Sequence, residues 1–281
     1  MSKVAVIGAG TMGNGIAHVF ASNGWDVTLI DVAEKQLEKA IATITKNMDR
    51  QIKKGALEEA DRDAVLGRIT TANALDAISG AELVIEAATE KANLKFEIFE
   101  KLDGLADDGV VLASNTSSIS ITEIAARTKR PDKVIGMHFM NPVPMMKLVE
   151  IIRGLGTSDE TTKDVMDTAS ALGKTPVEVN DYPGFVANRI LMPMINEAAY
   201  CVMEGVATPE AVDTVMKLGA AHPMGPLALA DLIGLDVCLS ILEVMHEGLG
   251  DSKYRPCPLL RKMVAAGRLG RKSGQGFYDY S

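Results

Sequence analysis

The chain has 281 residues, about twice the length of a typical single domain, so its length predicts two domains. Hydrophobic residues make up 47% and charged residues 23%, which excludes a disordered or collagen-like chain. The net charge is -8 and no run of five like charges occurs, so neither nucleic acid nor an anionic membrane is an expected partner.

The first half of the chain alternates strand-like and helical segments. Lys3–Ile7 and Asp26–Asp31 predict the first two strands, and Met12–Ser22 predicts a helix between them. Further strands are predicted at Leu83–Ala87, Val110–Ala113, Val134–Met137 and Leu148–Ile152. Since strand, helix and strand follow one another repeatedly, we predict an α/β fold with a Rossmann-type, doubly wound parallel sheet.

A helical hairpin is predicted as an insert after the second strand. Apolar residues at spacings of three and four predict a helix of about five turns that ends near Gly55. These residues are Leu37, Ala40, Ile41, Ile44, Met48 and Ile52. Glu58–Leu66 predicts a short helix that folds back. Basic residues at the end of the first helix, including Lys53 and Lys54, are either a phosphate contact or an ordinary solvated face.

The character of the sequence changes near Gly184, where β-branched runs give way to helical stretches. These are predicted at Phe185–Glu204, Pro209–Leu218, Leu227–Glu247 and Pro258–Ala265. Pro183 disfavours helix at the preceding residue, and Gly184 permits unusual backbone conformations, so the joint is placed at 181–184. We therefore predict a first domain over residues 1–183 and an all-helical second domain over 184–281.

A glycine-rich turn follows the first predicted strand. In Gly8–Gly13, Gly8 permits the tight turn, Gly10 allows close approach of a pyrophosphate, and Gly13 allows close packing of helix on strand. Thr11 and Met12 lie at the helix N-terminus and belong to the same predicted cofactor site. Asp31 ends the second strand, where a carboxylate accepts from ribose hydroxyls and repels a 2′-phosphate. The pattern predicts NAD rather than NADP, with a chance glycine turn as the alternative.

One histidine follows a predicted strand at the carboxyl edge of the sheet, where ligands of such folds bind. This residue is His138, and Glu150 in the next strand-like run is placed to return beside it. An imidazole has a pKa suited to taking a hydroxyl proton during hydride transfer, and a carboxylate would orient the ring. A structural role for a lone histidine stays open at this point.

The three cysteines are too widely spaced for a disulfide framework or a cysteine-based zinc site, so no metal is expected. Two residues precede the first predicted strand, which leaves no room for a targeting peptide unless a presequence has been removed. The expected compartment is the cytoplasm.

The sequence resembles the L-3-hydroxyacyl-CoA dehydrogenases, and in particular their short bacterial 3-hydroxybutyryl-CoA type. The matching motifs run in family order along the whole chain: Gly8–Gly13, Ser114–Ser118, His138–Pro144, Met146–Glu150, Pro183–Arg189 and Leu269–Tyr278. The resemblance implies reversible oxidation of (S)-3-hydroxybutyryl-CoA to acetoacetyl-CoA with NAD, in fatty-acid or butyrate metabolism.

The resemblance also implies roles for four catalytic residues. His138 would be the general acid and base, and Glu150 its partner. Ser117 and Asn188 would hydrogen-bond the 3-oxygen and the thioester region of the substrate. From the residues alone, Ser117 is read more simply as a helix cap, and Asn188 has a similar alternative.

Further roles implied by the resemblance concern the cofactor and coenzyme A. Glu90, Lys95 and Asn115 would line the nicotinamide end of NAD, although Asn115 is also a plausible helix cap. Lys53 and Lys54 would meet coenzyme A, without distinction between them. The helical second domain would form a homodimer.

Two rival functions stay open. The first is an NAD-dependent dehydrogenase of a sugar acid or other small hydroxy acid, which would not need the basic end of the hairpin around Lys53 and Lys54. The second is a non-catalytic NAD-binding structural relative, which the presence of His138 and Glu150 disfavours.

Overall fold

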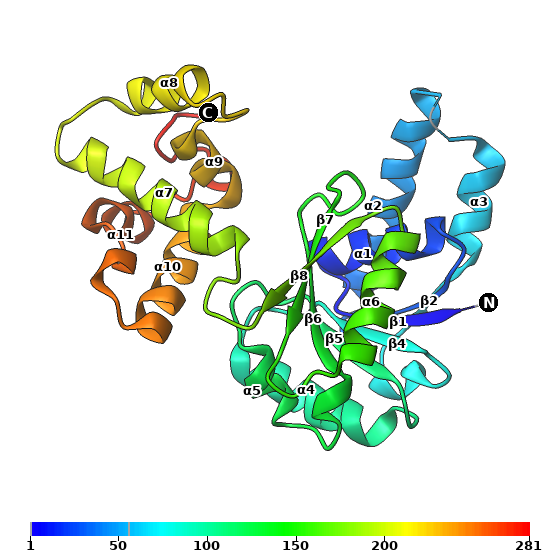
Figure 1. The fold of residues 1–281 in the computed structure, drawn as a ribbon. Helices are drawn as coiled ribbons and strands as arrows, with labels where there is room; N and C mark the ends of the chain where they lie inside the picture. The colour runs from blue at the N-terminus through cyan, green and yellow to red at the C-terminus, as the bar shows by residue number, and fades with distance from the viewer. Residues whose placement is uncertain (1, 56) are drawn as a thin grey trace. The chain divides into compact units, whose positions relative to one another are not determined.

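The structure is a computed structural model that describes residues 2–55 and 57–281. The chain divides into two compact units, residues 1–181 and residues 182–281 (Figure 1). The boundary predicted from the sequence, after Pro183, lies two residues further along the chain.

The first unit is built on one eight-stranded sheet with the strand order β3-β2-β1-β4-β5-β6-β7-β8. The strands are β1 Lys3–Ile7, β2 Asp26–Ile30, β3 Ile69–Ala72, β4 Leu83–Glu86, β5 Val111–Ser114, β6 Val134–Phe139, β7 Leu148–Arg153 and β8 Thr175–Asn180. The order reverses at β1, as in a doubly wound Rossmann sheet, so the predicted fold class is confirmed.

The sheet differs from the prediction in its pairing and at its edges. β7 runs antiparallel to β6, because the two strands are joined by a short loop rather than by a helical crossover. The edge strands β3 and β8 were not predicted. Most of their residues are half-buried or exposed, so they lack the apolar run of a central strand.

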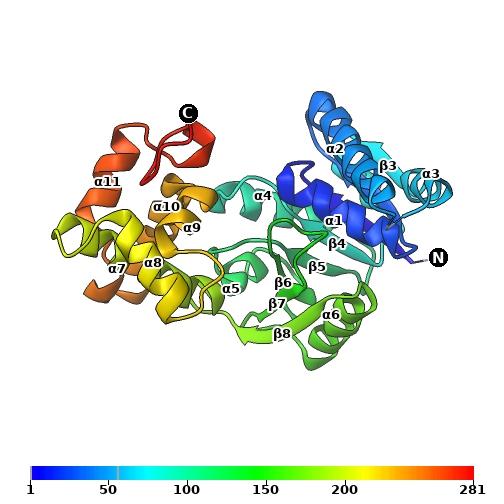
Figure 2. The same ribbon diagram turned by 90° about the horizontal axis from the view of Figure 1, so that it is seen from above.

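Helices cover both faces of this sheet (Figure 2). They are α1 Thr11–Ser22, α2 Glu34–Lys53, α3 Glu59–Gly67, α4 Ala92–Leu105, α5 Ile121–Ala125 and α6 Asp159–Ala171. Residues of α1, α2 and α6 share one core cluster with the strands. The predicted hairpin insert is formed by α2 and α3, and α2 buries Leu37, Ala40, Ile44 and Met48.

The second unit is entirely helical, as predicted. Its helices are α7 Ala187–Met203, α8 Pro209–Gly219, α9 Pro226–Ile233, α10 Leu235–Leu249 and α11 Pro258–Ala265. The single helix predicted over Leu227–Glu247 was wrong, because the chain breaks between α9 and α10 at Gly234, whose φ is +107°. This conformation is incompatible with a continuous right-handed helix.

A buried carboxylate on α9 forms hydrogen bonds with the C-terminal end of the motif Leu269–Tyr278. Asp231 accepts hydrogen bonds from the backbone N–H groups of Phe277 and Tyr278, both at 3.0 Å, and from the hydroxyl of Tyr280. A Cβ at Gly276 would lie 2.0 Å from an Asp231 carboxylate oxygen, so the chain passes too close for any larger residue. This contact accounts for a glycine within the motif.

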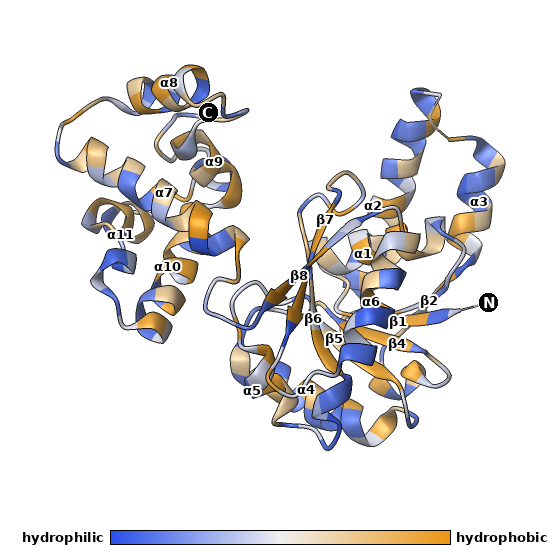
Figure 3. Cartoon of the chain, viewed as in Figure 1, coloured by the Kyte–Doolittle hydropathy of each residue, from blue (hydrophilic) through white to orange (hydrophobic). Residues whose placement is uncertain are grey.

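Hydropathy follows burial in the first unit. Strands β4, β5 and β6 are largely hydrophobic, whereas α2 and α3 carry hydrophilic residues toward their shared tip (Figure 3). Across residues 2–55 and 57–281, no helix combines the length and apolar character needed to cross a membrane.

Candidate active site

The glycine-rich turn has the geometry of a dinucleotide site. Gly8 adopts φ +95°, and a Cβ there would lie 2.7 Å from the carbonyl oxygen of Ala87. A Cβ at Gly13 would lie 1.7 Å from the carbonyl oxygen of Gly8, so α1 approaches the turn too closely for any side chain. A Cβ at Gly10, the N-cap of α1, would meet nothing within 4 Å. The helix N-terminus therefore faces open space that suits a pyrophosphate.

Asp31 directly follows β2 and supports this turn. Its carboxylate accepts from the N–H of Ala9 at 2.8 Å and from the N–H of Ala33 at 2.9 Å. A carboxylate offers about four acceptor positions, so it retains capacity for two ribose hydroxyls. Asp31 therefore lies beside the glycine-rich turn, and its contact with the ribose stays a prediction.

A cavity of about 410 Å³ lies beside Asp31 at the carboxyl ends of β1, β2 and β4. It is lined by Ile7, Gly8, Gly10, Ile30, Asp31, Val32, Gln36, Asn73, Leu75, Ala87, Ala88, Thr89, Leu94, Ile98 and Lys101. Its size and mainly apolar walls suit a nucleoside, so these residues fit the adenosine half of NAD.

His138 and Glu150 meet, as the sequence reasoning anticipated. They are directly opposite each other in the antiparallel pair β6–β7, and Nδ1 of His138 lies 2.8 Å from Oε2 of Glu150. Both residues are buried. One detail was wrong: His138 lies inside β6, because that strand continues to Phe139 rather than ending at Met137.

This pairing determines which ring nitrogen can act as a base. An ionised carboxylate only accepts hydrogen bonds, so Nδ1 carries the hydrogen that points to Glu150. In the neutral ring Nε2 is then the nitrogen that accepts a proton. Glu150 thus holds His138 in the tautomer required of a general base.

Asn115 connects this pair to the centre of the sheet. Its side-chain oxygen accepts from the backbone N–H of Phe139 at 2.9 Å, and its backbone N–H donates to the carbonyl oxygen of Glu86 at 2.7 Å. The helix-cap alternative does not describe Asn115, because Ser120 caps α5 by accepting from the N–H of Glu123.

Glu90 gathers several donors from the loop after β5. Its Oε1 accepts from the hydroxyl of Thr116 at 2.6 Å, and from the N–H and hydroxyl of Ser117 at 2.8 and 3.1 Å. The ammonium of Lys95 lies 3.3 Å from Oε2. Burial acts to raise the pKa of Glu90, but Lys95 and the donated hydrogen bonds outweigh it and hold the pKa below its usual value.

Sequence reasoning missed two residues of this cluster, Glu86 and Ser114. The Glu86 carboxylate accepts from the hydroxyl of Ser114 at 2.7 Å and from Lys95 Nζ at 2.7 and 2.9 Å. Both missed residues end strands, β4 and β5, at the ligand-binding edge of the sheet. A charged residue at the end of an apolar strand was the signal that could have indicated Glu86.

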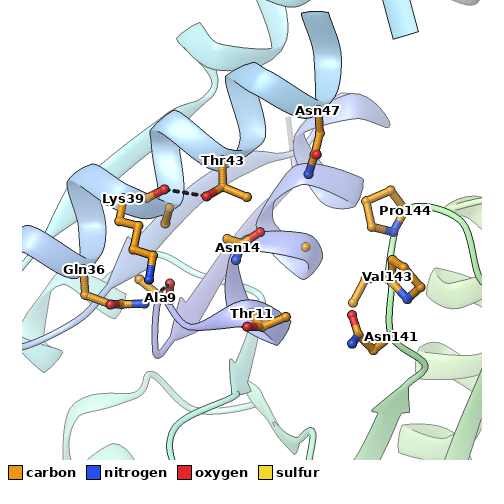
Figure 4. A pocket seen from close by; sticks show the side chains of 13 residues that line it. Ala9, Thr11, Asn14, Gln36, Lys39, Thr43, Asn47, Asn141, Val143 and Pro144 are labelled. Carbon is orange, nitrogen blue, oxygen red and sulfur yellow. Dashed lines mark hydrogen bonds between the residues drawn. The ribbon is translucent and has the colours of Figure 1, made fainter. Parts of the chain in front are cut away.

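A second pocket, also missed, lies between α1, α2 and residues 141–144 (Figure 4). It has a volume of about 230 Å³, and Figure 4 shows Asn14 of α1 facing the side of α2 that carries Thr43 and Asn47. The spacing of Thr43 and Asn47 by four residues places them on one face of α2. Their amide and hydroxyl groups make this a polar groove.

The remaining predicted residues lie on or at the end of helices α2 and α7. Lys53 is the last residue of α2, Lys54 follows it as the C-cap, and both are exposed. Asn188 is buried in the first turn of α7, where Val186 is the N-cap, so Asn188 is not the capping residue. Within the described ranges, no group of three or more His, Cys, Asp or Glu side chains is arranged to hold a metal ion.

Hydride transfer to a nicotinamide needs a dinucleotide site and a base close to it, and this edge of the sheet provides both. Fold and site together define an NAD-dependent dehydrogenase.

Comparison with known proteins identifies the family. The model of the 3-hydroxyacyl-CoA dehydrogenase NAD-binding domain matches residues 3–182, and that of the C-terminal domain matches residues 184–280. A probable 3-hydroxybutyryl-CoA dehydrogenase of Bacillus subtilis is 59% identical over 280 residues, covering 100% of this chain and 98% of the relative. The chain belongs to the 3-hydroxyacyl-CoA dehydrogenase family.

Solved structures and more distant relatives agree with this assignment. The crystal structure of (S)-3-hydroxybutyryl-CoA dehydrogenase from Ralstonia eutropha is 52% identical, with a TM-score of 0.97 over 100% of this chain and 99% of that one. Rat mitochondrial hydroxyacyl-coenzyme A dehydrogenase is 42% identical over 287 residues, covering 100% of this chain and 91% of the relative.

Proposed function

We propose that this chain catalyses the reversible oxidation of the (S)-3-hydroxyl group of 3-hydroxybutyryl-CoA by NAD, which gives acetoacetyl-CoA. The observation that carries the proposal is the buried His138–Glu150 pair, with 2.8 Å between Nδ1 and Oε2, at the carboxyl edge of a dinucleotide-binding sheet. Similarity to the Bacillus and Ralstonia enzymes supports this choice of substrate.

The residues divide the chemistry among them. Bound NAD supplies the hydride acceptor. Nε2 of His138 takes the proton of the 3-hydroxyl group during oxidation and returns it during reduction. Glu150 stabilises the imidazolium that forms. Ser117 hydrogen-bonds the 3-oxygen, and Asn188 hydrogen-bonds the thioester region.

Coenzyme A requires a longer binding surface than the reacting groups. The polar groove of Asn14, Thr43 and Asn47 offers hydrogen-bond partners for the two amides of a pantetheine arm. Lys53 and Lys54, exposed at the end of α2, supply positive charge for the nucleotide phosphates. A local basic site thus binds an anionic substrate on a chain of net charge -8.

We also propose a cytoplasmic homodimer formed through the second unit. Apolar side chains of this unit are exposed, including Ile190 at 69%, Val206 at 70% and Leu218 at 81%. Exposed apolar surface of this kind is typical of a protein interface. The three cysteines are free thiols, which suits a reducing compartment.

Consumption of NADH on addition of acetoacetyl-CoA tests the function directly. We expect turnover with acetoacetyl-CoA and a much lower kcat/KM with free acetoacetate, which has no nucleotide to bind. The His138→Ala variant should lose turnover by at least about 100-fold while it still binds NADH. Preference for the free acid would favour a small hydroxy-acid dehydrogenase, and no turnover of either substrate would favour a non-catalytic relative.

A further inference from the structure

A second buried charge pair lies behind the candidate site. Glu86 is completely buried at the end of β4, in register with Ile7 of β1 and Ser114 of β5. Besides Lys95 and Ser114, its carboxylate accepts from the N–H of Ala88 at 2.7 Å. Burial of a carboxylate without such partners would be strongly unfavourable, so these four groups form one unit.

Lys95 lies between two carboxylates. Its side chain is 1% exposed, and Nζ contacts both oxygens of Glu86 while it lies 3.3 Å from Oε2 of Glu90. The other oxygen of Glu90 accepts from Ser117. A continuous chain of polar contacts therefore runs from Glu86 through Lys95 and Glu90 to Ser117.

This chain of contacts is close to the reacting groups. The backbone N–H of Asn115 donates to the carbonyl oxygen of Glu86, and its side-chain oxygen accepts from the backbone N–H of Phe139, the residue after His138. During oxidation, hydride and proton leave adjacent atoms of one substrate group. The nicotinamide ring must therefore lie within a few ångströms of the hydroxyl oxygen from which His138 takes the proton. At this place the net charge of the cluster acts on the charge of the ring.

The charges of the cluster do not cancel. Glu86 and Glu90 each contribute one negative charge and Lys95 one positive charge, which leaves a net charge of about -1. The nicotinamide ring is cationic in NAD⁺ and neutral in NADH. A cluster with net negative charge therefore stabilises the oxidised cofactor relative to the reduced one.

We propose that Glu86 is a positioning residue with an electrostatic effect. It holds Lys95 in place to support Glu90 and Ser117, and it cancels the positive charge of Lys95, so that the cluster keeps one net negative charge and favours NAD⁺ over NADH. This inference rests on the proposed function only in placing the nicotinamide beside His138.

Three variants separate charge from structure. Glu86→Gln removes one negative charge, Lys95→Met removes the positive charge, and the double variant removes both. If one unit charge is removed about 10 Å from the cationic nicotinamide ring, at an effective dielectric constant of about 20, the affinity of the protein for NAD⁺ changes by roughly tenfold. We expect Glu86→Gln to raise the ratio Kd(NAD⁺)/Kd(NADH) about tenfold and Lys95→Met to lower it by a similar factor.

The double variant is the decisive member of the set, because its cluster again has a net charge of about -1. Its ratio should return to within about threefold of the wild-type value, while KM for acetoacetyl-CoA rises because Glu90 loses its support. Titration of NADH by fluorescence and of NAD⁺ by calorimetry gives both constants. Glu178→Gln on β8, an exposed carboxylate, is the matched control.

If Glu86 had a purely structural role, the variants would have a lower melting temperature and would bind NAD⁺ and NADH more weakly by the same factor. Unchanged ratios in both single variants would therefore overturn the proposal. If Glu86→Gln does not fold, Lys95→Met and the double variant still give different expectations, a ratio about tenfold below wild type and a ratio near wild type. A wild-type protein that binds NAD but does not reduce acetoacetyl-CoA would refute the proposed substrate and leave this binding test intact.

Discussion

Replacement of Glu150 by glutamine separates the charge of this side chain from its shape. In the wild type, Oε2 lies 2.8 Å from Nδ1 of His138, and the Glu150 side chain is 3% exposed. Glutamine has the same length, and its carbonyl oxygen can still accept the Nδ1–H. The variant therefore keeps the tautomer of His138 but removes the charge that stabilises the imidazolium.

The contact distance sets the size of the expected effect. Two unit charges about 4 Å apart interact by about 4 kcal/mol at an effective dielectric constant of about 20. The amide dipole of glutamine replaces part of this interaction, so we take roughly 3 to 4 kcal/mol as the loss in the transition state. This corresponds to a fall in kcat for oxidation of about 100- to 1000-fold.

Steady-state formation of NADH at saturating 3-hydroxybutyryl-CoA measures this loss. The Kd of NADH should change by less than about twofold, because Glu150 does not line the cofactor cavity and the reduced nicotinamide ring carries no charge. Glu178→Gln on β8 is again the control, since it removes only a surface ion pair with Arg153, and such pairs contribute little. A Glu150→Gln protein that is folded by circular dichroism and retains kcat within threefold of wild type would refute this reasoning.

Three further predictions follow from single contacts. Asp31→Ala should raise the KM of NAD at least about tenfold and relax discrimination against NADP, because the hydrogen bonds predicted between its carboxylate and the ribose would be lost. A preference of the wild type for NADP in the same assay would contradict this prediction. Gly13→Ala should raise the Kd of NAD at least about 100-fold, because the new Cβ would lie 1.7 Å from the Gly8 carbonyl oxygen and would displace the glycine-rich turn. Calorimetry measures this Kd, and a wild-type value would rule out the assignment of the turn to the pyrophosphate. Burial lowers the pKa of His18 below its usual value of 6.5, so the folded state favours the neutral ring. Below about pH 6.5 the unfolded chain binds a proton at His18 more readily than the folded protein does, so the stability of the fold decreases as the pH falls. Between pH 7.5 and 5, the melting temperature of wild type should therefore fall further than that of His18→Met, and parallel curves would exclude this residue.

The parts of the fold that sequence reasoning predicted are those where one local signal dominates. β1 was predicted with its observed bounds, because the four apolar residues after Lys3 end directly in a glycine turn. α11 was also predicted correctly, since Pro258 marks its first turn. In β1, which is buried on both faces, and in α11, which begins at a proline, the local sequence and the tertiary environment favour the same structure.

The elements that were missed depend on distant partners. β8 has mostly exposed or half-buried residues, and it is a strand only because Thr175–Asn180 pairs in parallel with β7. Gly234 falls inside the single helix that was predicted over Leu227–Glu247. Its φ of +107° follows from the packing of α9 and α10 and from the N–H of Leu235, which donates to Leu269. Neither contact is visible in a local window.

The candidate site shows the same division between local and distant signals. His138 and Glu150 were paired because His138 follows a predicted strand at the carboxyl edge and Glu150 lies in the next strand-like run, and a carboxylate beside an imidazole has an evident chemical use. Glu86 was overlooked because its partner Lys95 lies beyond a turn and on a helix, where a lysine is ordinarily a solvated residue. The end of an apolar strand was a local signal for Glu86, but nothing in the local sequence indicated that Lys95 is its buried partner. The groups that perform chemistry were therefore easier to predict than the groups that set the charge around them.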